Sequence, residues 1–433
     1  MKIKSILLLV LAVIVMTVAA TALLVNIFEH KQEEKISYFR VAAIPDLEPD
    51  PAVWGRNFPA QYEAYRKTMH TGEMIQYSRY GRFGGSEASS KLDRYPDTRR
   101  LFAGYAFAIE YNEERGHLRA VEDARNSKRL GDKKPGACMT CKSSQVPGIM
   151  KEIGPDAFYA KGFNQLIADH GIRHAIACAD CHDAATMSLA ISRPAFREAM
   201  DRRGVNLAEA SLQQMRTYVC AQCHVEYYFK GAEKYLTFPW ENGLTVDNIE
   251  AYYDGIGFQD WTHAESGAAM VKIQHPEFEL WSTGIHARAG VACADCHMPY
   301  MRQGAVKITD HWIRTPLAEP ETSCAGCHPL AGEELRGRVL EIQDRTYHLM
   351  QKSEKAIIAA LDAIREALGK GASAAALDSA RDLHRRASLR WDFISAENSM
   401  GFHSPQESVR ILGDAVDLAR QAEIAAIRAI PAK

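Results

Sequence analysis

Apolar residues follow two distinct patterns at the two ends of the chain. Near the N-terminus an apolar run covers residues 6–28 behind two lysines. Near the C-terminus, apolar side chains recur at steps of three and four or their multiples from Leu335 to Leu368. The first pattern is typical of an export signal or a membrane-spanning segment. The second predicts one long amphipathic helix that ends near Gly369.

The N-terminal run is closer in length to a membrane span than to a cleaved signal. A signal's apolar region has about 7–15 residues, whereas a span needs about 20. A small-x-small sequence at residues 20–22 keeps cleavage open as the alternative. We therefore expect residues 1–35 to be a signal or anchor segment, with an inner-membrane anchor at residues 6–28 favoured. In either case residues 36–433 belong on the periplasmic side.

Two further helices are predicted after the first long one. The second covers residues 375–395. The third begins at Pro405, with Ser404 as its cap and Glu407 completing a capping box. Long helices with an apolar seam pack on each other or on a second subunit. Residues 331–433 are therefore either an intramolecular bundle or the interface of a homodimer, and the sequence leaves both open.

The region between the two ends has a different character. Fifteen of the seventeen prolines lie between Pro45 and Pro329, which predicts short helices and loops with few strands. The net charge of -2 comes without a basic run, so we expect no nucleic-acid partner.

The ten cysteines all lie in five CxxC frames. Four frames end in histidine and one, CMTCK, ends in Lys142. A CxxC pair can be a redox disulfide, half of a zinc site or a c-type haem attachment. Only haem attachment explains the histidine directly after the second cysteine, where it becomes an axial ligand of the iron. We predict five covalent haems, held by Cys138, Cys141, Cys178, Cys181, Cys220, Cys223, Cys293, Cys296, Cys324 and Cys327.

Five haems in one chain of this length determine the expected fold class. Their apolar faces replace much of the usual side-chain core, so the haems must lie close together. We predict a mainly α protein in which a loop-rich domain, residues 36–330, wraps around five c-type haems. The long helices of residues 331–433 follow as an integral part of that domain. Electron transfer is therefore part of the function.

The axial ligands separate one haem from the other four. A haem with two histidine ligands has no vacancy and suits electron transfer. Among histidines outside the frames, His403 and His286 are favoured as second ligands, the first just before a helix and the second eleven residues before His297. Lys142 binds an iron only as a neutral amine, which burial and the cation encourage. An open sixth position there makes it the catalytic haem.

At these residues the chain resembles the pentahaem cytochrome c nitrite reductases, the ammonia-forming type. The resemblance runs from about Ala103 to the C-terminus. One CxxCK among four CxxCH is close to diagnostic of that family. The other matching stretches are LFAGYAFAIEYNEERGH, ACMTCKSS, CAQCHVEYYF, VKIQHPEFELWSTGIH, CADCHMP, TDH and the His-x-Pro at His403.

The resemblance implies a reaction and a pocket. Nitrite is reduced to ammonium by six electrons at the lysine-ligated haem, with electrons from a membrane quinol-oxidising multihaem cytochrome. Arg129, Tyr227 and His275 match the residues of the distal pocket. Arg129 and His275 suit attraction of an anion and delivery of protons, and Tyr227 can donate a hydrogen bond.

The resemblance also implies the remaining ligands. Across the four histidine-ligated irons it pairs His182 with His311, His224 with His117, His297 with His286, and His328 with His403. A calcium ion is expected beside the active site. Its ligands would be oxygens of the Glu226 carboxylate, the Tyr227 and Lys272 backbone carbonyls and the Gln274 side chain.

Two alternatives stay open at this point. A non-catalytic multihaem electron carrier would have five six-coordinate haems. A reductase with the same site could instead act on hydroxylamine, nitric oxide or sulfite.

Overall fold

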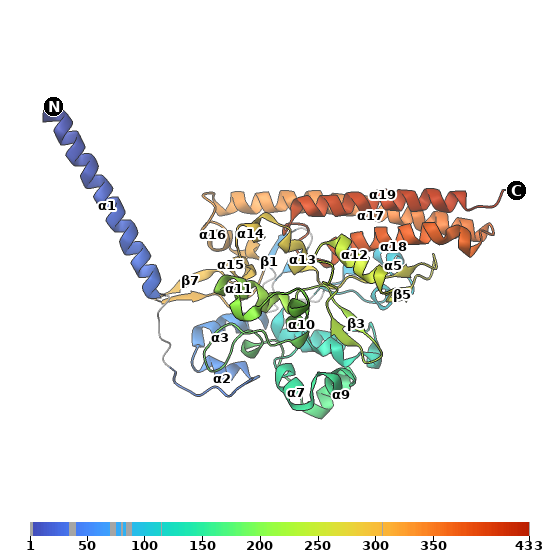
Figure 1. The fold of residues 1–433 in the computed structure, drawn as a ribbon, viewed down its shortest axis with the longest axis horizontal. Coiled ribbons are helices and arrows are strands. Elements are labelled where there is room, and N and C mark those ends of the chain that lie inside the picture. Colours follow the sequence, from blue (N-terminus) through green and yellow to red (C-terminus); the bar gives the residue numbers. More distant parts are fainter. Residues whose placement is uncertain are drawn as a thin grey trace.

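The computed structural model describes residues 3–33, 40–69, 75–78, 81–83, 89–113, 115–304 and 306–432. Figure 1 shows three parts: a separate N-terminal helix, a body of short helices and loops, and long helices along one side of that body. The predicted fold class, mainly α with few strands, is confirmed.

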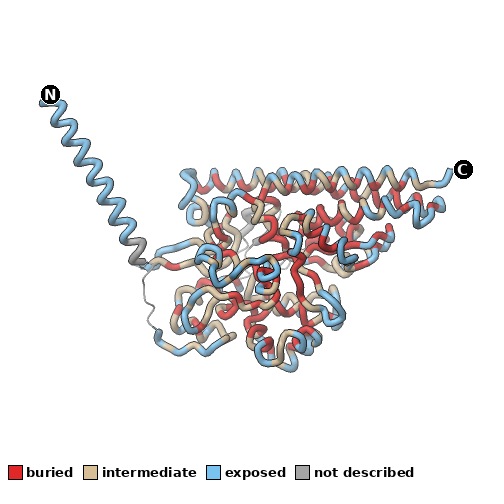
Figure 2. Tube along the Cα trace, in the orientation of Figure 1, coloured by how far each residue is buried: buried red, intermediate tan, exposed pale blue. Residues whose placement is uncertain are grey.

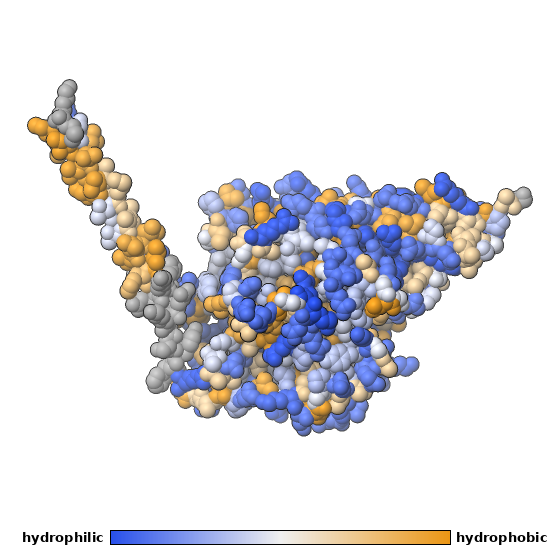
Figure 3. Space-filling model, viewed as in Figure 1, coloured by the Kyte–Doolittle hydropathy of each residue, from blue (hydrophilic) through white to orange (hydrophobic). Residues whose placement is uncertain are grey.

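Helix α1 (Ile3–Glu33) stands away from the body in Figure 1. Its stretch from residue 3 to residue 28 is long and apolar enough to cross a membrane, and none of the most apolar part is buried. Figure 3 shows the same helix as a mainly apolar surface beside a mainly hydrophilic body. An export segment is therefore supported. Whether it is an anchor or a cleaved signal stays a prediction, and the boundary expected after residue 35 lies outside the described residues.

The body consists of short elements, as its prolines predicted. Among the described residues, its strands form four separate antiparallel pairs. These pairs are β1 (Ile75–Ser78) with β2 (Gly81–Phe83), β3 (Tyr228–Lys230) with β4 (Tyr235–Thr237), β5 (Trp261–Thr262) with β6 (Ala269–Met270), and β7 (Tyr300–Gln303) with β8 (Val306–Thr309).

Proline begins many of the body's helices because its ring presets the backbone angle of a first helical turn. The α-helices of the body are α2 (Pro51–Gly55), α3 (Pro59–Arg66), α4 (Lys91–Arg94), α5 (Thr98–Leu101), α6 (Ala120–Asn126), α7 (Val146–Ile153), α8 (Pro155–Tyr159), α9 (Phe163–His170), α10 (Pro194–Arg202), α11 (Leu212–Ala221), α12 (Val246–Gly255), α13 (Glu277–Ser282), α14 (Ile285–Arg288), α15 (Cys293–His297) and α16 (Pro320–Ser323).

Three long helices form what we call the C-terminal bundle: α17 (Gly332–Gly369), α18 (Ala374–Ala396) and α19 (Pro405–Arg428). They pack against one another along one side of the body. The intramolecular bundle expected from the apolar periodicity is therefore present. A homodimer interface on the same helices stays a prediction.

One predicted detail of the bundle is wrong. Helix α19 begins at Pro405 as expected, but Ser404 makes no side-chain cap bond and no capping box forms. The Glu407 carboxylate instead receives two hydrogen bonds from the Arg410 guanidinium, at 3.0 and 2.6 Å. A fork-shaped contact between two charged groups is stronger than a contact to a backbone amide, so Glu407 pairs with Arg410 and not with the helix N-terminus.

The apolar core has two main parts. One joins the C-terminal bundle to segments of the body that include Phe102, Trp261 and Ile273. The other gathers side chains between Ala137 and Phe278, and Cys138 and Cys141 pack at its edge. In Figure 2 the buried positions concentrate where the bundle meets the body and through the middle of the body. The first CxxC frame therefore rests on one of the best-packed regions.

Leu412 tests the packing of the bundle, since its side chain is fully buried between the three long helices. We expect Leu412→Ala to lower the free energy of unfolding by about 2–5 kcal/mol, because truncating a buried leucine removes apolar contacts and creates a cavity. Val409→Ala, on the same helix but half exposed, is the control with little effect. Guanidinium unfolding of the haem-loaded protein measures both, and equal shifts in the two midpoints would contradict this packing.

Candidate active site

Eight of the predicted ligands come together as four histidine pairs. The ring centroids lie 6.3 Å apart for His182 and His311, 6.3 Å for His117 and His224, 6.2 Å for His286 and His328, and 6.3 Å for His297 and His403. A metal–imidazole bond is about 2 Å long and the ring centre lies about 1 Å behind its nitrogen, so two rings that share one iron have centroids about 6 Å apart. All four spacings fit one iron between each pair.

Two of the expected pairings are wrong, because the structure exchanges their partners. His286 lies beside His328, and His403 lies beside His297. Closeness in sequence favoured His286 with His297, but α14 and α15 are separate helices joined by a turn at Gly290. The short turn keeps the two helices close together. The direction in which each imidazole points is set by contacts with other parts of the chain.

The cysteine frames share a local geometry that explains their spacing. In three frames the backbone amide of the histidine donates to the carbonyl of the first cysteine, at 2.9 Å for His182 and 3.0 Å for His224 and His328. One helical turn therefore places the first cysteine and the histidine on the same face. The Lys142 amide donates instead to Met139, at 3.0 Å, so its frame is wound more tightly. None of the ten cysteines is paired in a disulfide bond.

The frames lie next to one another in space. The Cys141 and Cys223 side chains are electrostatic neighbours, and so are those of Cys220 and Cys293. Cys296 and Cys324 are also electrostatic neighbours. The frame of Lys142 is thus the end of a continuous series of attachment sites. Haems held there would lie close together, as the sequence analysis expected.

Arg193 ties the first two frames together. It is fully buried, and its guanidinium donates to the carbonyls of Thr140 and Ser143, at 2.6 and 3.1 Å, and to the Asp180 carboxylate. Burial and Asp180 have opposite effects on its pKa, which the structure holds above its usual value. A charged group inside the protein is stable only with such partners. The backbone on both sides of Lys142 is therefore fixed by one buried cation.

Two of the predicted pocket residues converge on the Lys142 frame. Tyr227, Cys138 and Cys141 pack against the same apolar core, and the two cysteines are electrostatic neighbours of Tyr227. Burial raises the pKa of Tyr227 well above its usual value, and Arg129 opposes the rise. The Arg129 guanidinium lies over the Phe107 ring, 4.5 Å from its centre, and its Nε donates to the Ser127 hydroxyl at 3.1 Å.

His275 reaches this region through its neighbour in the chain. The Gln274 backbone amide donates to Glu226 Oε2 at 2.5 Å, and Glu226 directly precedes Tyr227. The two segments that carry Tyr227 and His275 are therefore bonded together. Arg129 and Tyr227 thus lie within electrostatic range of the Lys142 frame, and His275 lies on the adjoining segment.

The residues expected to bind calcium fit a hard cation. Glu226 is fully buried, and its oxygens accept from Tyr253 at 2.7 Å and from Gln274. Burial raises the pKa of Glu226 well above its usual value, so its ionised form lacks a strong enough positive partner. The Gln274 amide meets the Lys272 carbonyl at 3.1 Å. A rotated amide would present its oxygen there, and carboxylate, carbonyl and amide oxygens are calcium's preferred ligands.

The side chain of Lys272 has a separate task that the sequence did not reveal. Its ammonium donates to both oxygens of Asp392, at 2.9 and 3.0 Å. It also lies over the rings of Phe102, Phe107 and Tyr111. Lys272 and Arg129 therefore both contact the Phe107 ring, which helps to hold the Arg129 guanidinium in place.

Comparison with known proteins identifies the family. A sequence profile of the cytochrome c552 family matches residues 50–433. The chain belongs to that family. It is 42% identical over 412 residues to a cytochrome c-552 of Bacteroides fragilis, covering 93% of this chain and 82% of the relative. A cytochrome c-552 of Porphyromonas gingivalis is 42% identical over 382 residues, covering 86% of this chain and 75% of that relative.

A solved structure extends the family relation to the fold. The catalytic subunit of the cytochrome c nitrite reductase from Desulfovibrio desulfuricans, which has two calcium sites, matches with a TM-score of 0.83 and 34% identity. The match covers 90% of this chain and 88% of that one. The family resemblance predicted from the cysteine frames is confirmed, and this cytochrome c552 member is a multihaem c-type cytochrome.

Gly284 tests how α14 is seated against the loop that carries His403. A Cβ at Gly284 would lie 2.1 Å from the His403 carbonyl oxygen, which is too close for any real contact. We expect Gly284→Ala to displace His286 or His403 and to alter the low-spin signal of at least one haem by electron paramagnetic resonance. The matched control is Gly148→Ala in α7, where a Cβ meets nothing within 4 Å. Identical low-spin spectra for both variants would contradict the packing described.

Proposed function

We propose that this protein reduces nitrite to ammonium, using six electrons, at the haem centre of Lys142 on the periplasmic side of a membrane. The carrying observation is the single frame with lysine in the histidine position, and the electrostatic influence of Arg129 and Tyr227 on its cysteines supports it. The fold match to a cytochrome c nitrite reductase supports the same reaction.

The residues present fit five c-type haems. The ten cysteines would attach them, the four histidine pairs would each hold one iron, and Lys142 would bind the fifth. When bound, those haems would supply electron transfer and, at Lys142, a redox-active iron for a small ligand.

The pocket residues suit an anionic substrate that must take up protons. Reduction of one nitrite to ammonium and two waters consumes six electrons and eight protons. Arg129 presents a guanidinium whose position is fixed by Phe107 and Ser127, so it can bind and orient the anion. Tyr227 stays a protonated phenol because burial raises its pKa, and it can donate a hydrogen bond. His275 is the remaining candidate for proton delivery.

A calcium ion would stabilise the same pocket from outside. The proposed ligands are oxygens of Glu226, Tyr227, Lys272 and Gln274. The cation would offset the buried charge of Glu226 and would fix the segments that carry Tyr227 and His275.

The electron donor and the export segment complete the proposal. A membrane quinol-oxidising multihaem cytochrome would supply electrons. Helix α1, as an uncleaved anchor, would keep both proteins at one surface. N-terminal sequencing of the purified protein decides between the alternatives, since a mature chain starting near Leu23 would exclude the anchor.

The lysine provides the sharpest test of the function. The purified protein with reduced viologen and nitrite should form ammonium. Lys142→His should keep its haem attached through Cys138 and Cys141 but reduce nitrite much more slowly, because histidine is a different donor to the iron. Lys151→His, an exposed lysine on the neighbouring helix α7 that pairs with Asp46, is the control with unchanged turnover. Equal rates for wild type and Lys142→His would mean that the lysine is incidental.

The same assay separates the alternatives. A carrier would give no ammonium and five six-coordinate haems. Parallel assays with hydroxylamine, nitric oxide and sulfite show which substrate has the highest kcat/KM. A preparation with an open haem that forms no ammonium from nitrite would reject the proposed reaction.

Gln274 tests the calcium site. We expect Gln274→Ala to lower calcium affinity and nitrite turnover, with added calcium restoring part of the turnover, because one oxygen ligand is lost. Calorimetric titration of the chelated protein with calcium measures the affinity directly. Gln145→Ala, a half-buried glutamine that bonds to Arg173 and His174 on another loop, is the control. If turnover is insensitive both to Gln274→Ala and to a chelator, the ion is not part of the site.

A further inference from the structure

The loop between α18 and α19 places a carboxylate on a predicted iron ligand. Glu397 Oε1 bonds to His403 Nδ1, the ring nitrogen that faces away from His297 if the other nitrogen holds an iron. The Glu397 side chain is fully buried. Its second oxygen accepts from the Ser399 amide at 3.1 Å and from the Ser399 hydroxyl at 2.7 Å. The carboxylate is therefore held rigidly against the imidazole.

The next residue of the same loop reaches a second histidine. Asn398 Nδ2 donates to Glu277 Oε1 at 2.6 Å, and that oxygen lies 3.9 Å from His224 Nδ1. Asn398 Oδ1 faces the Lys91 ammonium at 3.5 Å. The loop of residues 397 to 399 therefore contacts two histidine pairs. It bonds directly to His403 of one pair, and it approaches His224 of the other through Glu277.

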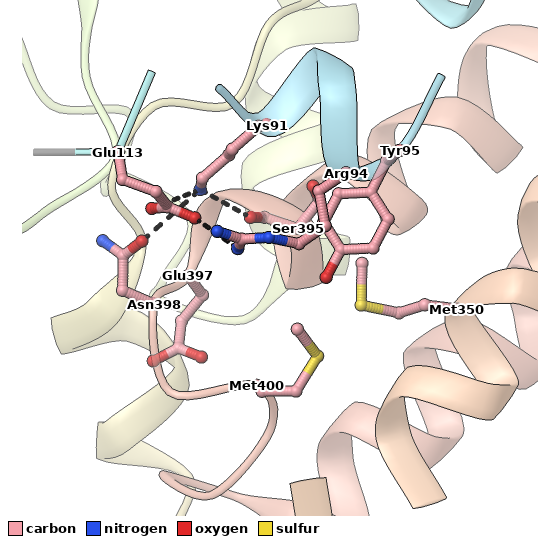
Figure 4. A pocket seen from close by; sticks show the side chains of 9 residues that line it. All are labelled: Lys91, Arg94, Tyr95, Glu113, Met350, Ser395, Glu397, Asn398 and Met400. Atoms are coloured by element: carbon pink, nitrogen blue, oxygen red, sulfur yellow. Dashed lines mark hydrogen bonds and ion pairs between the residues drawn. The ribbon is translucent and has the colours of Figure 1, made fainter. Parts of the chain in front are cut away.

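Figure 4 shows the surroundings of this loop. Glu397 and Asn398 line a small pocket with Lys91, Arg94 and Glu113. Both cations are occupied by Glu113, which lies 2.9 Å from Arg94 and 3.6 Å from Lys91. Lys91 also donates to the Ser395 carbonyl at 3.3 Å. Glu113 is thus the carboxylate bonded to these two cations, while the Glu397 carboxylate bonds to His403 and Ser399.

Other predicted ligands have a neutral partner at the same ring nitrogen. The Nδ1 atoms of His182, His311 and His297 each meet a backbone carbonyl, that of Met187 at 3.0 Å, Thr309 at 2.7 Å and Arg314 at 2.9 Å. A carbonyl orients an imidazole without a full charge. A carboxylate in that place makes the imidazole a stronger electron donor to a metal.

We infer that Glu397 and Glu277 are positioning residues that lower the reduction potentials of two neighbouring haems, those attached at Cys293/Cys296 and Cys220/Cys223. A more basic axial imidazole stabilises ferric over ferrous iron, and hydrogen bonding around the axial ligand is one of the levers by which a protein sets a haem potential. The inference rests on the axial-ligand assignment proposed above and does not depend on the substrate.

The positions of the two haems indicate how the two carboxylates would affect electron transfer. Cys220 lies against Cys293, and Cys223 lies against Cys141 of the Lys142 frame. The lowered potentials would therefore belong to the two attachment sites that lead to Lys142. Electrons held on that pair would have a larger driving force toward the Lys142 haem than electrons held on haems with neutral partners.

Redox titration at one fixed pH, followed by electron paramagnetic resonance on the full-length, haem-loaded protein, tests the inference. In Glu397→Gln the partner loses its charge but keeps its shape. We expect the equilibrium constant for reduction of one low-spin haem to increase tenfold. For one electron this raises the reduction potential of that haem by about 59 mV. Glu277→Gln should raise the potential of a different low-spin haem.

A third variant predicts the opposite sign. Ser399→Ala removes a hydroxyl donor from Glu397, which leaves a more basic carboxylate on His403, so the same haem should move to a lower potential. This variant decides the question if Glu397→Gln fails to assemble all five haems. Glu250→Gln is the control, because it removes a buried negative charge that pairs with Arg386 and Arg390 of α18.

The outcomes distinguish the proposed role of the two carboxylates from the assignment of the axial histidine ligands on which it rests. Four low-spin haems with unmoved potentials in all three variants would overturn the role of the carboxylates and leave the ligands intact. A wild-type spectrum without four bis-histidine haems would overturn the ligand assignment and this inference with it. Loss of nitrite turnover alone, without a change of potential, would also count against the inference.

Discussion

The spacing of four histidine pairs is the constraint on which the rest of this structure depends. Two imidazoles that share an iron must face each other across about 6 Å, and the four pairs lie at 6.2 or 6.3 Å. The partners come from segments far apart in sequence. Short helices, tight turns and a well-packed C-terminal bundle therefore serve to hold backbone positions, and the body has little regular sheet.

The pocket around Lys142 shows how buried charges are managed in such a fold. Arg193 fixes the backbone on both sides of Lys142, and Lys272 with Asp392 supports Phe107 beneath Arg129. Glu226 is the buried charge without an adequate partner among these, and calcium would supply one. The carboxylates on His403 and His224 extend the same principle to the electron path. Charge placement, rather than the haems alone, would then distinguish the five sites.

The sequence predicted the haem attachment sites, which depend on local structure. It did not predict the directions of side chains that depend on contacts between distant segments. The CxxC frames need only one helical turn, so ten cysteines and the residues after them predicted the attachment sites and the family. The partners of His286 and His403 were exchanged because tertiary contacts, such as Gly284 against the His403 carbonyl, direct those imidazoles. Glu407 had the correct spacing for a capping box but paired with Arg410. Glu397 was missed because an acid six residues before a histidine is not a motif.

The central claim is that one haem, at Lys142, is open to substrate while the other four are closed by histidine pairs. Electron paramagnetic resonance of the oxidised protein, recorded with and without nitrite, tests it most directly. We expect four low-spin haems that nitrite leaves unchanged and one further haem whose signal changes when nitrite binds. Five low-spin haems with no response to nitrite would contradict it.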